Sequence, residues 1–243
     1  MFRFLKASAL ILLFCGSTLA DDRFLDAGAP AADREWRAAD YKTVVQILSE
    51  KKAPLPRLEE TDGKKVLQRF CSIENLTFGR NRTLPLSSRM EDFFGLQQSA
   101  NQVTKLYVAE AVGGAKVAGE MSLLLGFMLH VSALGIDLVG EFLPTIPKDS
   151  RYQARMDALA QMRSGLATIF TGAYSSIADD QIYTDDQRSS MLAAVAATAD
   201  QFSSVLGADT KVEMISKFSK LQGRFTSPND LKYIETITKM LGR

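Results

Sequence analysis

Apolar residues recur every three or four positions along most of the chain, which is the spacing of one face of an α-helix. Residues that favour helix starts stand before most of these segments, namely Asp33, Thr61, Ser88, Ser150, Thr184, Thr210 and Ser227. No run of alternating β-branched and polar residues between turns predicts a strand. The pattern therefore predicts an all-α fold, a bundle of about seven helices around a central pair.

Several signals predict where individual helices begin and end. Ser88 with Glu91, Thr184 with Gln187, and Thr210 with Glu213 have the spacing of capping boxes, in which two side chains satisfy each other's backbone donors. The adjacent residues Gly113 and Gly114 predict a break. The segment 75–87 contains Pro85 and is expected to be a loop. The face of the helix after Thr61 is expected to bury Val66, Leu67, Phe70 and Ile73.

The stretch from Gly119 to Leu143 is apolar nearly all round. Its uncharged part, between Glu120 and Asp137, has 16 residues. A helix of that length spans roughly 24 Å at 1.5 Å per residue, whereas a bilayer core measures about 30 Å. The run is therefore too short for a convincing membrane span, and it is expected to be a helix buried inside the protein.

Small residues recur every seven positions in this stretch and in the next segment. They are Gly119, Gly126, Ala133 and Gly140, followed by Ala158, Gly165 and Gly172. Such spacing places small residues along one helix face, where they let two helices pack closely. We therefore expect residues 115–143 and 150–178 to form a central antiparallel hairpin with Gly126 against Gly172.

In this hairpin register, opposite charges near the turn are expected to pair. Asp137 would lie near Arg163, and Glu141 near Arg155. The many charges at the turn oppose crossing a membrane tip first, because each would lose its hydration. The sequence favours a hairpin covered by amphipathic helices, with membrane insertion as the less favoured alternative.

The N-terminus has the three-part pattern of a secretory signal. Arg3 and Lys6 precede an apolar run, and small residues end at Ala20. We expect cleavage of residues 1–20 and a single all-α domain at 21–243, exported most plausibly to a bacterial periplasm. A lipoprotein signal that retains Cys15 is the less favoured alternative, because Phe14 stands where a small residue is usual.

Removal of residues 1–20 takes away Arg3 and Lys6, leaving 27 basic and 28 acidic residues. This near balance argues against nucleic acid as a partner. Only Cys71 then remains, so no internal disulfide can form. Asn75 and Asn81 begin matches to the glycosylation pattern, which matter only in a eukaryotic source.

Candidate chemistry is sparse. His130 is the only histidine, and packing is favoured over a role as ligand or base. A Cys71–His130 pair would need an electropositive, partly exposed thiol, which the apolar surroundings of Cys71 do not predict. The acidic segment 179–186 lacks the spacing of a calcium loop. We expect no cofactor, no metal site and no enzymatic activity, and we name no catalytic residue.

These observations predict a non-catalytic exported protein that binds or scaffolds another envelope or secreted protein. The alternative is a protein that binds a lipid or hydrophobic ligand, or perturbs a membrane, through the apolar segment 115–178. A cavity along residues 121–136 would favour that alternative, and close contact between Gly126 and Gly172 would oppose it. The oligomeric state and the identity of the partner are left open by the sequence.

Overall fold

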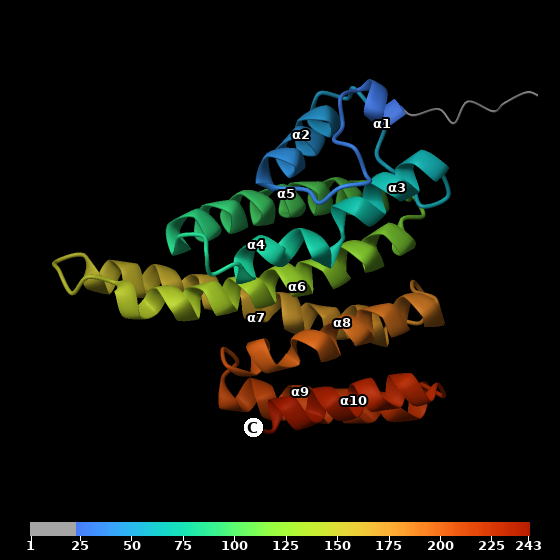
Figure 1. The fold of residues 1–243 in the computed structure, drawn as a ribbon. Helices are drawn as coiled ribbons and strands as arrows, with labels where there is room; N and C mark the ends of the chain where they lie inside the picture. The colour runs from blue at the N-terminus through green and yellow to red at the C-terminus, as the bar shows by residue number, and fades with distance from the viewer. Residues whose placement is uncertain (1–22) are drawn as a thin grey trace, which may run out of the picture.

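A computed structural model describes residues 23–243, which form helices and no strand (Figure 1). The expected signal peptide and Cys15 lie outside the described residues. The α-helices are α1 (Arg23–Asp26), α2 (Ala38–Ser49), α3 (Thr61–Phe70), α4 (Thr77–Arg80), α5 (Leu86–Val112), α6 (Ala118–Phe142), α7 (Tyr152–Ala178), α8 (Asp185–Ser203), α9 (Ala208–Leu221) and α10 (Pro228–Leu241). Three 3₁₀ turns lie between them: η1 (Ile73–Leu76), η2 (Leu143–Thr145) and η3 (Gln222–Arg224). The predicted all-α class is confirmed.

Some of the predicted helix ends are confirmed. The Thr184 side chain accepts a hydrogen bond from the backbone N–H of Gln187, and the Gln187 side chain completes the capping box of α8. Ser227 is the N-cap of α10, with Pro228 in the first turn. Gly113 ends α5, and Gly114 follows with a φ of 89°. These signals are local, so the sequence carries them in full.

Two of the predicted capping boxes are wrong. Helix α5 begins at Leu86 with Pro85 as its N-cap, so Ser88 already lies in the first turn. Helix α9 begins at Ala208 with Gly207 as its N-cap, two residues before Thr210. In both cases the N-cap lies three residues, nearly one helical turn, before the predicted capping residue. The segment 75–87 is also not a plain loop, because it contains the end of η1 and the single turn α4.

Helix α6 lies in the middle of the molecule, between a layer formed by α2 and α5 and a layer formed by α7 and α8 (Figure 1). Its side chains contribute to two hydrophobic clusters. Leu124, Phe127 and Val131 belong to the first cluster, together with α2, α3 and α5. Leu129 and Ile136 belong to the second cluster, together with α7 to α10. The apolar stretch is thus buried because it serves both clusters.

A central hairpin of residues 115–143 and 150–178 is not confirmed. Helix α6 packs most extensively against α8 and α5, and less against α7. Helix α7 buries only Leu166, Phe170, Ala173 and Ile177. The insertion of α8 beside α6 explains this difference, since α8 supplies the apolar surface expected from α7.

The expected close contact between Gly126 and Gly172 is wrong. A Cβ atom built on Gly126 would lie 3.7 Å from Cβ of Ala194 in α8. Cβ atoms built on Gly140, Gly165 and Gly172 would have no neighbour within 4 Å. Of the remaining small residues, Gly119 lies against Leu58, Ala133 is buried in α6, and Ala158 is exposed on α7. Seven-residue spacing alone therefore did not identify the packed faces.

The charge pairs expected near the turn are also different. Glu141 pairs with Arg89 of α5 at 2.7 Å and with Arg82 at 3.4 Å, instead of Arg155. Arg155 pairs with Asp149 at 2.9 Å. Arg163 donates a hydrogen bond to the backbone oxygen of Ser204, at 3.1 Å, instead of pairing with Asp137. Asp137 and Glu141 consequently face α4 and α5 rather than α7.

Residues Ala118–Thr145 meet the length and apolarity of a membrane-spanning helix, with a mean hydropathy of 1.9 over the most apolar window. Within the described residues this is the one helix that does so. Of that window, 67% is buried inside the protein. This is the behaviour of a core helix, which passes the same test of length and composition.

Candidate ligand-binding groove along α6

Two adjoining cavities lie on the surface of α6. The first encloses about 210 Å³ and is lined by Ile73, Leu76, Thr77, Arg80, His130, Ala133, Leu134, Asp137, Ala197, Thr198 and Gln201. The second is more open, holds about 540 Å³, and extends to Arg82, Gly140, Glu141 and Ser204. Both are lined by Arg80, Leu134 and Asp137. We call the two together the α6 groove, with η1 and α4 on one side and α8 on the other.

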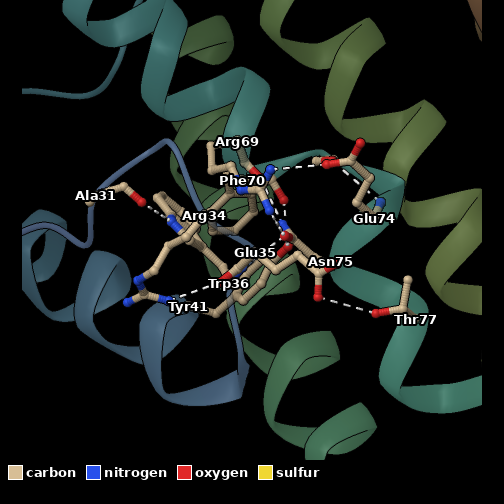
Figure 2. Close-up of polar contacts among 11 residues, drawn as sticks. Ala31, Arg34, Glu35, Trp36, Tyr41, Arg69, Phe70, Glu74, Asn75 and Thr77 are labelled. Atoms are coloured by element: carbon tan, nitrogen blue, oxygen red, sulfur yellow. Dashed lines mark hydrogen bonds and ion pairs between the residues drawn. The ribbon is translucent and has the colours of Figure 1, made fainter. Parts of the chain in front are cut away.

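The wall formed by η1 and α4 is held in place by Asn75, whose side chain is 1% exposed (Figure 2). Asn75 Oδ1 accepts hydrogen bonds from the Trp36 backbone N–H, at 2.9 Å, and from the Arg69 guanidinium, at 3.0 Å. Its amide nitrogen donates to the Tyr41 hydroxyl and to the Arg69 backbone oxygen, both at 2.7 Å. One side chain therefore ties η1 to α3 and to the start of α2.

The two candidate glycosylation sites differ in their accessibility. The amide nitrogen of Asn75 is buried and already donates two hydrogen bonds, so the folded protein has no room for a glycan there. The Asn81 side chain is exposed, and its Oδ1 accepts hydrogen bonds from Thr83. Of the two, only Asn81 is accessible in the folded state.

The other end of the wall is held by an ion pair between buried Arg89 and half-buried Glu141. Arg89, 4% exposed, donates to the Gly79 backbone oxygen at 2.9 Å and to Glu141 at 2.7 Å. The hydrogen bond from Arg89 lowers the pKa of Glu141. The pair joins the end of α4 to α6 through α5, and so fixes the width of the groove at its open end.

Arg80 and His130 face the closed cavity without protein partners. The guanidinium of Arg80 is exposed and makes no hydrogen bond or ion pair with any residue of 23–243. His130 is half-buried, and its ring nitrogens make no hydrogen bond within the same described residues. Asp137 lies at the rim and accepts a hydrogen bond from Gln201. These three side chains come from α4 and α6, two elements far apart in sequence.

The groove changes the protonation behaviour of two groups. Partial burial lowers the pKa of His130, and the positive charge of Arg80 lowers it further, so the imidazole is neutral at neutral pH. Partial burial also raises the pKa of Asp137, against the opposing effects of the Gln201 hydrogen bond and the Arg80 charge. The cavity thus presents one cation, one carboxyl group and one neutral imidazole.

The structure does not bring Cys71 into this site. Cys71 is 8% exposed, belongs to the first hydrophobic cluster and does not line the groove. Burial raises the pKa of its thiol, which keeps the thiol protonated. A Cys71–His130 nucleophile pair therefore has no support from the geometry.

The acidic segment 179–186 is engaged by arginines. Asp180 pairs with Arg224, and Asp185 pairs with the buried Arg188 at 3.1 Å. No group of three or more His, Cys, Asp or Glu side chains suited to a metal ion occurs among residues 23–243. Asp179 accepts hydrogen bonds from the backbone N–H groups of Gln181 and Ile182, so three of the four acidic residues have partners within the fold.

Sequence reasoning singled out His130 but missed its neighbours. The sequence predicts a loop around Arg80 and an ion pair between Asp137 and Arg163. Ile73 was expected to face inward, yet it is 58% exposed at the rim of the closed cavity. One signal in the sequence could have indicated this site. Arg80 and Arg82 have no acidic residue three or four positions before them, so neither has a partner for an ion pair along a helix.

Comparison of the chain with protein-family models, with curated proteins and with solved structures gives no match. The functional argument therefore rests on the groove itself.

Proposed function

We propose that this protein is an exported, non-catalytic binding protein that holds a segment of another envelope or secreted protein in the α6 groove. One observation carries the proposal: Arg80 and His130 line a cavity and have no hydrogen-bond or ion-pair partner among residues 23–243. The guanidinium of Arg80 is exposed and the ring of His130 is half-buried, so both groups can exchange water for the acceptor groups of a ligand.

Two other acidic residues in the interior support this interpretation, because each of them has a hydrogen-bond partner within the protein. Buried Glu120 accepts hydrogen bonds from the Leu58 N–H and from Arg57. Buried Asp230 accepts one from Ser189. Asp137 differs, because its raised pKa means that the fold is less stable when this carboxyl group is ionised. Residues that cost stability and face a cavity are typical of binding sites.

The alternative is a protein that binds a lipid or hydrophobic ligand through residues 115–178. One observation supports it and one opposes it. A cavity does lie along α6, but Arg80, His130 and Asp137 line it together with threonine and glutamine. An acyl chain would leave those groups dehydrated and unpaired. The lining favours a polar ligand with an apolar part.

The test uses a photo-crosslinking amino acid in place of Ile73, at the rim of the groove, in the full chain expressed with its own N-terminus in its native host. Val212 of α9, which is 68% exposed and far along the chain from the groove residues, is the control position. We expect a defined protein adduct from position 73 and none from position 212, in the periplasmic fraction. Equal adducts at both positions, or none at either, would contradict the proposal.

A further inference from the structure

We propose that the closed end of the α6 groove binds the C-terminal residue of a polypeptide. This inference rests on the proposed function, since it names the part of the partner that enters the groove. It is carried by the placement of a cation, an imidazole and a carboxyl group around one enclosed space of about 210 Å³.

Arg80 is the group that recognises the terminal carboxylate. A guanidinium offers several N–H donors in a planar fork that matches a carboxylate, and Arg80 has all of its donors free with respect to residues 23–243. Neutral His130 lines the same cavity and adds one N–H donor. Together they can satisfy both oxygens of one carboxylate.

Asp137 disfavours the binding of simpler anions. Its carboxylate lines the same cavity as Arg80, yet the two form no ion pair within 4 Å. A fatty acid or a fully ionised phosphate would satisfy Arg80 but would offer no donor to offset its repulsion by Asp137. A terminal residue carries a carboxylate and a backbone N–H on the same carbon atom, so it offers an acceptor to Arg80 and a donor to Asp137.

The remaining lining selects an apolar terminal side chain. Leu76, Ala133 and Leu134 supply apolar surface, and all three are at least nine-tenths buried. The cavity holds about 210 Å³, which is small beside the roughly 300–1,000 Å³ of sites for drug-sized ligands, so we expect a single residue to enter it. Burial of an apolar side chain there adds to affinity in proportion to the area removed from water.

The second cavity explains why we infer a polypeptide rather than a free amino acid. It continues from Arg80 and Asp137 toward Glu141 and Ser204, and its volume of about 540 Å³ accommodates the residues that precede the terminus. A free amino acid would leave this part of the groove unused. A polypeptide is therefore expected to bind more tightly than its terminal residue alone.

The experiment measures fluorescence anisotropy of hexapeptide pools, labelled at the N-terminus, mixed at five positions and defined at the last. Each pool is prepared as the free acid and as the C-terminal amide, and is titrated with the full processed chain. We expect acids that end in leucine, isoleucine, valine or phenylalanine to bind, and to bind at least about tenfold more tightly than the amides.

The variant Arg80→Gln is expected to weaken binding of the acids at least about tenfold and to leave the amides unchanged. Arg80 makes no hydrogen bond or ion pair with residues 23–243, so this variant should unfold like the parent in a thermal melt. Arg151→Gln, which changes an exposed arginine at the start of α7, is the matched control and should bind like the parent.

Four results would overturn the inference: amides that bind as tightly as acids, free leucine that binds as tightly as the pools, full affinity in Arg80→Gln, or no binding by any pool. The crosslinking test separates this failure from a failure of the proposed function. An adduct at position 73 without a preference for acids would remove the C-terminal inference and leave the binding role in place.

Discussion

At the scale of single residues, two helical glycines show how the surroundings decide what a glycine does. A Cβ atom on Gly135 of α6 would clash with the ring of Phe93, which is completely buried. A Cβ atom on Gly165 of α7 would meet nothing within 4 Å. Gly135 is required by the close approach of α5, whereas Gly165 only adds backbone freedom that the helix must lose.

We therefore predict opposite effects from the same substitution. Gly135→Ala should destabilise the protein by about 1–3 kcal/mol, because the Phe93 ring cannot move without overpacking its neighbours. Gly165→Ala should stabilise it by about 0.5–1 kcal/mol, because alanine restricts the unfolded chain and suits a helix. Urea unfolding of both variants measures this, and equal effects of one sign would contradict it.

His130 predicts a pH dependence of stability. Its pKa in the fold lies below the ordinary value of 6.5, so the unfolded chain binds this proton more tightly than the folded protein does. The stability that depends on a neutral His130 is complete above pH 6.5 and falls as the pH decreases through the lowered pKa. The fall ends once both states are protonated.

The variant His130→Gln should remove this component. Free energies of unfolding measured in urea at pH 7.5 and pH 5.0 are compared for parent and variant, which cancels the titration of all other groups. The parent should lose more stability than the variant between the two pH values. A constant difference between parent and variant would show that His130 does not titrate in this range.

At the scale of elements, Asn75 is the connection on which the position of α4 depends. Asn75→Ala would leave the Trp36 N–H without its acceptor and would remove the hydrogen bond that the Tyr41 hydroxyl accepts, in a region that excludes water. The Tyr41 hydroxyl would still donate to the Phe70 backbone oxygen. We expect a loss of about 2–4 kcal/mol, since each unsatisfied buried group costs about 1–3 kcal/mol. Asn81→Ala, at the exposed asparagine, should cost less than about 1 kcal/mol. Chemical denaturation would contradict the argument if the two variants were equally stable.

The elements that could be predicted are those that carry their signals locally. The capping box at Thr184 and the break at Gly113 depend on residues within one turn, and both are confirmed. The partner of α6 depends on residues more than 50 positions away, such as Ala194 opposite Gly126. A repeat of small residues indicates which face of a helix allows close packing, but it does not indicate which other helix packs there.

At the scale of the whole molecule, the groove could not be predicted because its residues come from separate parts of the chain. His130 and Asp137 share a face of α6 at a spacing of seven, which the sequence shows. Arg80 reaches them only because Asn75 and Arg89 fix η1 and α4 against α6. In the sequence Asn75 matches only a glycosylation motif, and nothing marks Arg89 as a buried residue.

The position of α6 between two hydrophobic clusters also bears on whether the described residues unfold as one unit. Trp36, the only tryptophan, lies in the first cluster, whereas Leu129 of α6 is completely buried in the second. If α6 couples the clusters, a loss of packing in the second must destabilise the first. Two independent units would instead transmit no effect to Trp36.

We predict that Leu129→Ala lowers the free energy of unfolding by about 2–5 kcal/mol, the usual cost of a large cavity in a core. The change should be the same whether unfolding is followed by Trp36 fluorescence or by far-ultraviolet circular dichroism, because one cooperative transition reports identically to both. A fluorescence transition that stays in place while the dichroism transition shifts would show that α6 separates two units instead of joining them.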